Sequence, residues 1–319
     1  MSTRKIALIA FGGNALLPPG SSGTVEEQLA AAEETARDLI GIIKQGYKLV
    51  IVHGNGPQVG NALIRAEEST NKVPMISLDV CVAQTQGEMG YLLNRGLYNE
   101  LAKCSISMPV ITLVTHCMVD RHDPSIQNPS KPIGPFYAQH RAEELKKTRN
   151  WNIIQDSGRG YRRIVASPKP ISVMEMDFIK HVINTTDSIL ICGGGGGIPA
   201  YIGNGDQKLY GIEGVIDKDF TAALIAKELK ADLFIIVTQI DRVAVNFNTA
   251  NQKFLSKVSL SEIKEYQIEG HFPPGSMGPK IRASIDFVEN TGKEVIITRS
   301  DLLNSSLLGK SGTHIIPDK

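Results

Sequence analysis

Short apolar runs recur along the chain, and several of them end at a glycine-containing loop. Continuous runs of this length are typical of parallel strands that are buried on both faces of a sheet. They alternate with stretches in which apolar residues have helical spacing, so the pattern predicts an α/β fold. The expected strands are Ile6–Phe11, Lys48–His53, Val110–His116, Ser188–Ile191, Asp232–Thr238 and Glu294–Thr298.

The first such unit can be followed residue by residue. Thr24-Val-Glu-Glu27 has the form of a capping box and predicts the start of a helix, whose end is expected at Gly46. A strand, a loop, a helix and a second strand in this order form a right-handed crossover. His53-Gly-Asn-Gly-Pro57 then repeats the plan, because proline suits the first turn of a helix.

Residues 120–170 differ from the rest of the chain in composition and pattern. They are rich in Pro, Arg, Lys, Asn and Gln and show little apolar periodicity. We expect this segment to leave the main sheet. Beyond it, residues 201–214 are predicted to form a short hairpin, and a helix is expected to open at Val215–Asp219. The apolar pair Ile315–Ile316 is predicted to form a short edge strand.

Composition narrows the class of protein. The 319 residues are 42% hydrophobic and 21% charged, which is ordinary for a globular protein of one large or two modest domains. The net charge of +1 gives no general attraction to nucleic acid or to a membrane surface, so neither is an expected partner. The four cysteines lack disulfide or metal-site spacing, which predicts reduced thiols, a cytoplasmic location and no metal site built from the protein.

The loop most open to interpretation is the run Gly193–Gly197, directly after a predicted strand. Glycines allow close approach to the backbone, and open α/β sheets bind ligands at the carboxyl ends of their strands. A flexible loop is the alternative. Two more glycine loops, Gly12-Gly13-Asn14 and Gly54-Asn55-Gly56, also follow strands, and together the three predict one phosphate-binding centre that uses backbone N–H groups.

Lysines at the edges of such loops are candidates to neutralise phosphate charge. Lys218 stands between Asp217 and Asp219 at a predicted helix start, where Asp217 could orient lysines or could simply cap the helix. Lys280 follows Gly275-Ser-Met-Gly-Pro279, and a cation at a helix N-terminus is unfavourable unless an anion binds there. Lys131 lies between prolines and, taken alone, reads as a surface residue.

For the other candidate catalytic and anion-binding residues, a purely structural interpretation is favoured. His53 could act as a general base, but a buried, hydrogen-bonded histidine is the favoured interpretation. Arg159, Arg162 and Arg163 could clamp an anion, although a solvated turn is favoured. The P-loop pattern GxxxxGK[ST] does not occur, which excludes that class of kinase.

Seven motifs, taken in order, resemble the carbamate kinases of the amino acid kinase superfamily. No single glycine motif is specific, but seven in the right order and spacing are. They are Phe11-Gly-Gly-Asn-Ala15, His53-Gly-Asn-Gly-Pro-Gln-Val-Gly60, Gln84-Thr-Gln-Gly87, Lys131-Pro-Ile-Gly-Pro-Phe-Tyr137, Gly194-Gly-Gly-Gly-Ile-Pro199, Val215-Ile-Asp-Lys-Asp219 and Pro274-Gly-Ser-Met-Gly-Pro-Lys280.

The resemblance implies a homodimer with a three-layer α/β/α sandwich around a mainly parallel sheet of about eight strands. Residues 1–206 would bind carbamate or carbamoyl phosphate, residues 207–319 would bind ATP or ADP with Mg²⁺, and residues 119–168 would form a small protruding lid subdomain. The implied reaction transfers a phosphoryl group between ATP and carbamate, and is run toward ATP synthesis in arginine breakdown.

The resemblance also implies roles for individual residues. Lys131, Lys218 and Lys280 would stabilise the phosphoryl group, and Asp217 would orient the lysines. The substrate would be held by Gly12, Gly13, Asn14, Gly54, Asn55 and Gly56. The nucleotide would be held by Gly194, Gly195, Gly196, Asp219, Thr238, Met277 and Gly278.

Two positions depart from the wider superfamily. Ala10 stands where many members carry a lysine, which favours a carbamate kinase, with Lys131 as the substitute, over an acetylglutamate or aspartate kinase. Gln239 stands where an acidic residue is expected, which leaves the nucleotide side open. The rival hypotheses are an N-acetylglutamate kinase and a catalytically silent module that senses nucleotide or carbamoyl phosphate.

Overall fold

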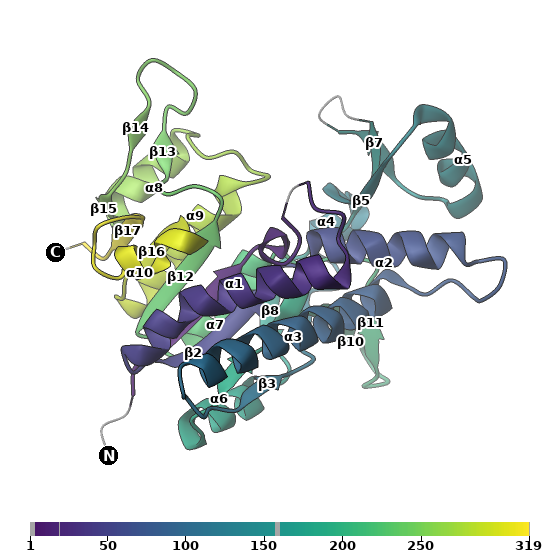
Figure 1. Ribbon diagram of the computed structural model, residues 1–319. Coiled ribbons are helices and arrows are strands. Elements are labelled where there is room, and N and C mark those ends of the chain that lie inside the picture. The colour runs from purple at the N-terminus through teal and green to yellow at the C-terminus, as the bar shows by residue number, and fades with distance from the viewer. Residues whose placement is uncertain (1–3, 19, 157–159, 319) are drawn as a thin grey trace.

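The computed structural model describes residues 4–18, 20–156 and 160–318, and its centre is an eight-stranded sheet (Figure 1). Six neighbouring strands of this sheet run parallel, and one antiparallel pairing, β16 with β17, reverses the last two. In sheet order the strands are β15 (Lys257–Ser259), β17 (Thr313–Ile316), β16 (Val295–Arg299), β12 (Leu233–Thr238), β1 (Ile6–Phe11), β2 (Lys48–His53), β9 (Ile189–Ile191) and β3 (Val110–Thr112).

Helices cover both faces of this sheet, because successive residues of each strand point to opposite sides. In β1, Ile9 packs with α1, α3 and α10, whereas Leu8 packs with α6, α7, α8 and α9. This arrangement confirms the three-layer α/β/α sandwich. The helices are α1 (Val25–Lys44), α3 (Leu78–Lys103), α6 (Met176–Thr185), α7 (Lys218–Glu228), α8 (Leu260–Ile268), α9 (Met277–Thr291) and α10 (Leu303–Ser306).

Local signals place several of these boundaries. Thr24 and Glu27 form the expected capping box of α1, with Thr24 Oγ1 accepting from the Glu27 N–H at 3.3 Å. The helix ends at Lys44, just before Gly46 adopts a positive φ of 84°. The next loop leads into α2 (Gly56–Glu68), with Pro57 in its first turn as expected.

The predicted strand at Val110–His116 is wrong as a single element. It divides into β3, in the large sheet, and β4 (His116–Val119), which joins a second sheet with β8 (Pro170–Val173), β10 (Ile198–Ile202) and β11 (Leu209–Gly211). The chain turns away at Thr115, whose backbone N–H and C=O are both bound by the Gln86 side chain. The periodicity of apolar residues cannot predict a break in a strand that depends on hydrogen bonds from a distant side chain.

The carboxyl-terminal edge also differs from expectation. Ile315–Ile316 do belong to a strand, but β17 lies inside the sheet, because β15 covers its outer side. The polar segment before it contains β15 and a small ribbon of β13 (Ala244–Val245) with β14 (Lys253–Phe254), strands too short for a periodic signal. The predicted hairpin at residues 201–214 forms from β10 and β11, and it spans the predicted domain boundary at residues 206 and 207.

The segment after residue 119 protrudes from the sandwich (Figure 1). Its core is a three-stranded sheet of β5 (Lys131–Tyr137), β7 (Tyr161–Val165) and β6 (Ile153–Gln155), covered by α5 (Gln139–Arg149), with a short α4 (Pro124–Gln127) leading in. We call this unit the lid. It rests on α2, where the buried Glu67 accepts from Arg141 at 2.5 Å and from the Tyr137 hydroxyl at 3.1 Å.

Across the described residues, no helix is both long enough and apolar enough to cross a lipid bilayer.

Candidate active site

The glycine run lies at the carboxyl end of β9, and Gly193–Gly197 are all buried. Gly194–Gly196 form a 3₁₀ turn, and four of the five glycines have positive φ. A Cβ on Gly195 would meet the Asn55 side chain at 2.3 Å, and one on Gly196 would meet the Ile216 carbonyl oxygen at 2.4 Å. The flexible-loop alternative is therefore wrong, since only glycine fits this packed turn.

Three hydroxyl and amide side chains hold the run in place. The Thr115 hydroxyl accepts from the Gly193 N–H at 2.9 Å, while Gln86 fixes the Thr115 backbone. From the other side, the Thr221 hydroxyl of α7 donates to the Gly196 carbonyl at 2.7 Å. Sequence reasoning missed these residues, although the Gln84–Gly87 motif on α3 pointed to their neighbourhood.

The run borders a cleft of about 500 Å³, which we call the glycine cleft. The other two glycine loops also line it, as do all three candidate lysines and Asp217, so the structure brings these residues together at one cleft. Gly12, Gly13, Gly54, Asn55, Gly56 and Gly195 contribute to its wall. The backbone of Asn14 lies in the adjoining 3₁₀ turn, but its side chain lies outside what the structure describes.

The centre of the cleft is a buried carboxylate shared by two lysines. Asp219 Oδ1 accepts from Lys218 Nζ at 2.5 Å, and Asp219 Oδ2 accepts from Lys280 Nζ at 3.1 Å. Lys218 and Asp219 begin α7, and Lys280 lies in the first turns of α9. Two helix N-termini therefore bring their lysines to one point, where partial positive charge favours an anion.

Burial and charge act in opposite directions on this group. Desolvation lowers the pKa of the buried Lys218 ammonium, and Asp219 only partly offsets that effect. Burial alone would raise the pKa of Asp219, but the charges of Lys218 and Lys280 bring it below its ordinary value of 3.8. Asp219 is thus ionised at neutral pH and holds both lysines in position.

Asp217 caps α7, and the lysine that it binds is Lys131 of the lid rather than its neighbour Lys218, which pairs with Asp219. Asp217 Oδ1 accepts from the Asp219 N–H at 3.1 Å and so caps α7, while its Oδ2 accepts from Lys131 Nζ of the lid at 3.1 Å. The cap thereby orients a lysine. Lys131 is not an isolated surface residue, because its ammonium reaches across from the lid to the start of α7.

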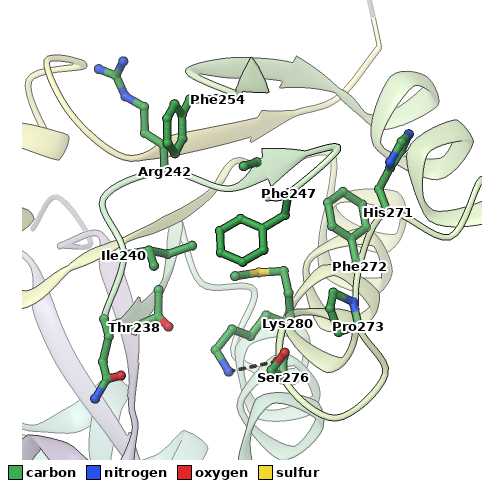
Figure 2. A pocket seen from close by; sticks show the side chains of 13 residues that line it. Thr238, Ile240, Arg242, Phe247, Phe254, His271, Phe272, Pro273, Ser276 and Lys280 are labelled. Carbon is green, nitrogen blue, oxygen red and sulfur yellow. Dashed lines mark hydrogen bonds between the residues drawn. The ribbon is translucent and has the colours of Figure 1, made fainter. Parts of the chain in front are cut away.

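A second cavity, of about 270 Å³, adjoins the glycine cleft, and Ser276 and Lys280 line both. We call it the aromatic cavity. Figure 2 shows the Phe247 ring between Ile240 and Phe272, above the Lys280 side chain. Of the residues expected to hold the nucleotide, Thr238 and Met277 line this cavity, and so does Gln239.

The remaining expected nucleotide residues lie elsewhere. Asp219 and Gly195 line the glycine cleft, and Gly194, Gly196 and Gly278 are not among the lining residues of either cavity. Gly278 packs behind the cavity wall, where a Cβ would meet the Pro273 carbonyl oxygen at 3.0 Å. The assignment of all seven residues to the nucleotide stays a prediction.

His53 is buried beside the glycine run and does not line the glycine cleft. Burial lowers the pKa of its imidazole to about 4, so the ring is neutral at pH 7. Its Nδ1 lies 3.3 Å from the Gly54 carbonyl oxygen. The packed, hydrogen-bonded histidine is the interpretation that this geometry supports.

The arginines of the lid have separate roles. Arg162 lines the glycine cleft, where its Nε donates to the Gly134 carbonyl at 3.1 Å. Arg163 instead stacks on Trp151 and pairs with Glu213 at 2.9 Å. Arg159 lies outside the described residues, so a three-arginine clamp cannot be assembled from them.

Within the described parts of the chain, no cluster of three His, Cys, Asp or Glu side chains could hold a metal ion. Both carboxylates of the cleft are already engaged by lysines and by a backbone N–H. The lining has four cationic side chains and two carboxylates, so its formal charge is positive. Chemically, the cleft is suited to binding and positioning a polyanion that brings its own counter-ion.

Known proteins are similar to this chain over nearly its whole length. Residues 5–299 match the amino acid kinase family. A carbamate kinase of Thermococcus kodakarensis is 44% identical over 315 residues, covering 98% of this chain and 99% of the relative. A carbamate kinase of Trichomonas vaginalis is 41% identical over 98% and 99%. The structure of carbamate kinase from Giardia lamblia bound to AMP-PNP superposes with a TM-score of 0.93 at 37% identity, covering 100% of both chains.

The shared carboxylate yields a prediction for stability. Asp219→Asn removes the charge that compensates two lysines, one of them buried, so we expect the free energy of unfolding to fall by about 3 kcal/mol. Denaturant titration at pH 7 measures this loss. The exposed pair Arg4–Asp187 offers a control, and Asp187→Asn should change stability little.

The same variant has a characteristic pH dependence. The folded-state pKa of Asp219 lies below 3.8, so the stabilisation is fully present above that value and is lost as pH falls through the folded-state pKa. The stability difference between wild type and Asp219→Asn should therefore be constant near neutral pH and narrow only in strong acid. A difference that narrows between pH 7 and pH 5 would contradict this account.

Proposed function

The chain belongs to the amino acid kinase family and, within it, to the carbamate kinases, and from this premise we propose that it catalyses reversible, Mg²⁺-dependent phosphoryl transfer between ATP and carbamate. The products are ADP and carbamoyl phosphate. One observation supports the proposal most directly: Lys218 and Lys280 share the Asp219 carboxylate where the glycine cleft meets the aromatic cavity. That junction is where a phosphoryl group would pass between the two substrates.

The chemistry needs little from the protein beyond position and charge. The attacking oxygen of carbamate is already anionic, so no general base has to remove a proton, which is consistent with a neutral, buried His53. The transferring group carries negative charge on its equatorial oxygens. Backbone N–H groups of the glycine loops and the ammonium groups of Lys131, Lys218 and Lys280 would bind those oxygens, and Asp217 would orient Lys131.

We assign the substrates to the two connected cavities. Carbamate or carbamoyl phosphate would occupy the glycine cleft, against Gly12, Gly13, Asn14 and the Gly54–Gly56 loop. The base of ATP or ADP would enter the aromatic cavity beside Phe247, Met277 and Thr238, because apolar and aromatic walls suit a purine. This assignment corresponds to lobes of residues 1–206 and 207–319, with residues 119–168 as the lid.

The magnesium ion would arrive with the nucleotide. Mg²⁺ retains water and prefers phosphate oxygens, and the cleft's carboxylates already have partners, so the nucleotide would supply most of its ligands. When bound, the ion neutralises charge between neighbouring phosphates. The protein's own contribution is to hold that complex next to Lys280 and Lys218.

We also propose the cellular setting that the family implies. The enzyme would run toward ATP synthesis during arginine breakdown, because carbamoyl phosphate is a reactive mixed anhydride. A cytoplasmic location is supported by four cysteines that are all free thiols. Comparing the ratio of the four reactants in arginine-fed cells with their equilibrium ratio tests the proposed direction.

A homodimer is the proposed assembly. Tyr91 and Tyr98 lie seven residues apart on one side of α3 and are 58% and 68% exposed, next to a groove that reaches edge strand β3. Exposed aromatic side chains of this kind are typical of interfaces. Sedimentation equilibrium should give twice the chain mass of 34.6 kDa, and Tyr91→Glu with Tyr98→Glu should shift it toward the monomer.

The decisive test is a coupled assay of ATP formation. Purified protein with carbamoyl phosphate, ADP and Mg²⁺ should produce ATP. Phosphorylation of N-acetylglutamate in place of this reaction would identify the rival enzyme. Nucleotide binding without turnover of either substrate would identify a silent sensing module.

Lys131→Ala tests the role of the lid. Turnover should fall by about 10²–10³-fold, because one preorganised cation is lost from the phosphoryl site. The dissociation constant of ADP should remain close to that of the wild type, since Lys131 does not line the aromatic cavity. Steady-state kinetics and nucleotide titration give the two quantities.

Lys147→Ala is the matched control, since Lys147 is an exposed lysine of α5 in the same lid. It should leave both quantities unchanged. Wild-type turnover in Lys131→Ala would rule out the assignment of Lys131 to the phosphoryl group.

A further inference from the structure

Asn55 is held at the floor of the glycine cleft by a residue of another helix. It is the residue before α2, it is buried, and it lines the cleft. Its amide Nδ2 donates to the hydroxyl of Thr85 at 2.9 Å. Thr85 belongs to α3 and is fully buried, so it lies behind Asn55 and does not line the cleft.

The hydroxyl of Thr85 fixes which way the Asn55 amide is turned. A hydroxyl has one proton, and that of Thr85 is donated to the Val82 carbonyl at 2.7 Å. Toward Asn55 the hydroxyl can therefore only accept. The NH₂ end of the amide must face Thr85, and the carbonyl end must face away from it.

The carbonyl oxygen of Asn55 has no hydrogen-bond partner in the part of the chain that the structure describes. An asparagine before a helix usually caps it with this oxygen, yet Asn55 makes no such cap on α2. Among the described residues Oδ1 accepts no hydrogen bond. It is also not one of the side-chain oxygens that are both without a partner and inaccessible to solvent. It is thus an acceptor in contact with the cleft, beside the backbone N–H groups that begin α2.

We propose that Thr85 is a positioning residue for substrate selection: it turns the Asn55 amide so that Oδ1 accepts a hydrogen bond from the amino group of carbamate or carbamoyl phosphate. The inference rests on the proposed function and adds a cause for its specificity. Nearby N–H groups would bind the anionic oxygens, while Oδ1 is an acceptor placed where a substrate N–H can meet it.

Acetyl phosphate provides a probe that isolates this contact. It differs from carbamoyl phosphate by a methyl group in place of the amino group, so it presents the same phosphate and carbonyl without the donor. A site that binds a substrate N–H leaves its own acceptor unpaired when the donor is absent, which discriminates against the analogue. Discrimination between the two phosphates therefore reports on the orientation of Asn55.

Thr85→Val removes the hydroxyl and retains the side-chain shape. We expect kcat/KM for carbamoyl phosphate to fall by about tenfold and that for acetyl phosphate by less than about threefold, with the KM for ADP unchanged. Thr85→Ser keeps the hydroxyl and should restore the wild-type ratio. If wild type does not turn over acetyl phosphate, its inhibition constant against carbamoyl phosphate replaces kcat/KM as the readout, with the same threefold limit.

A double-mutant cycle separates positioning from general damage. If Thr85 acts through Asn55, then Thr85→Val should change the ratio no further in an Asn55→Ala background. Thr313→Val is the matched control, because Thr313 of β17 is also fully buried. Its hydroxyl also accepts one hydrogen bond, from the Val243 N–H, and donates another, to the Leu255 carbonyl. The control substitution should lower thermal stability without altering the ratio.

The possible results separate the role of Thr85 from the proposed kinase activity. Equal losses for both phosphates, no loss for either, or additive effects in the cycle would overturn the role of Thr85 while carbamate kinase activity stands. Absence of ATP formation from carbamoyl phosphate by the wild type would overturn the proposed function and this inference together.

Discussion

The carboxylate of Asp219 is buried, and its two oxygens bind two different ammonium groups. Lys218 precedes it in the chain, whereas Lys280 comes from another helix, so one side chain determines the relative position of α7 and α9 at their N-termini. A buried pair of this kind is held by geometry and hydrogen bonding rather than by net Coulomb gain. The glycine cleft and the aromatic cavity meet at this point.

The packing around the glycine run makes that geometry possible. Thr221 of α7 donates to the Gly196 carbonyl, and Thr115 accepts from the Gly193 N–H, so the turn is held near both of its ends. The absence of side chains in the run lets Asn55 and Ile216 approach it closely. Much of the run is therefore a spacer that brings α7 and the Gly54–Gly56 loop together, with Gly195 alone of its residues on the cleft wall.

Sequence reasoning reached the fold and the convergence of the lysines because both leave strong local signals. Buried parallel strands appear as apolar runs, and ordered motifs identified the family. It did not separate β3 from β4 or place β15 at the edge, it assigned no role to Thr85 and Gln86 although both lie in the Gln84–Gly87 motif, and it did not find Thr115 or Thr221. Those features depend on hydrogen bonds between residues distant along the chain. The sequence around a single threonine in a helix does not indicate which distant residue its hydroxyl binds.

The lid meets the body of the protein where two glycines touch. A Cβ on Gly60 of α2 would lie 3.1 Å from the Gly134 Cα of β5, so the two backbones are in direct contact at this point, beside an apolar cluster that joins Val59 and Leu63 of α2 to Ile133 of β5. The lid is therefore held on α2 by a close backbone contact, by apolar packing and by the bonds that Arg141 and Tyr137 donate to Glu67. Lys131 and Arg162 belong to the same unit, since their strands β5 and β7 are paired, with a register shift between Ile133 and Tyr137. A methyl group added at Gly60 would press on the Gly134 backbone and so shift the strand that begins with Lys131, while every charged group of the cleft stayed chemically unchanged.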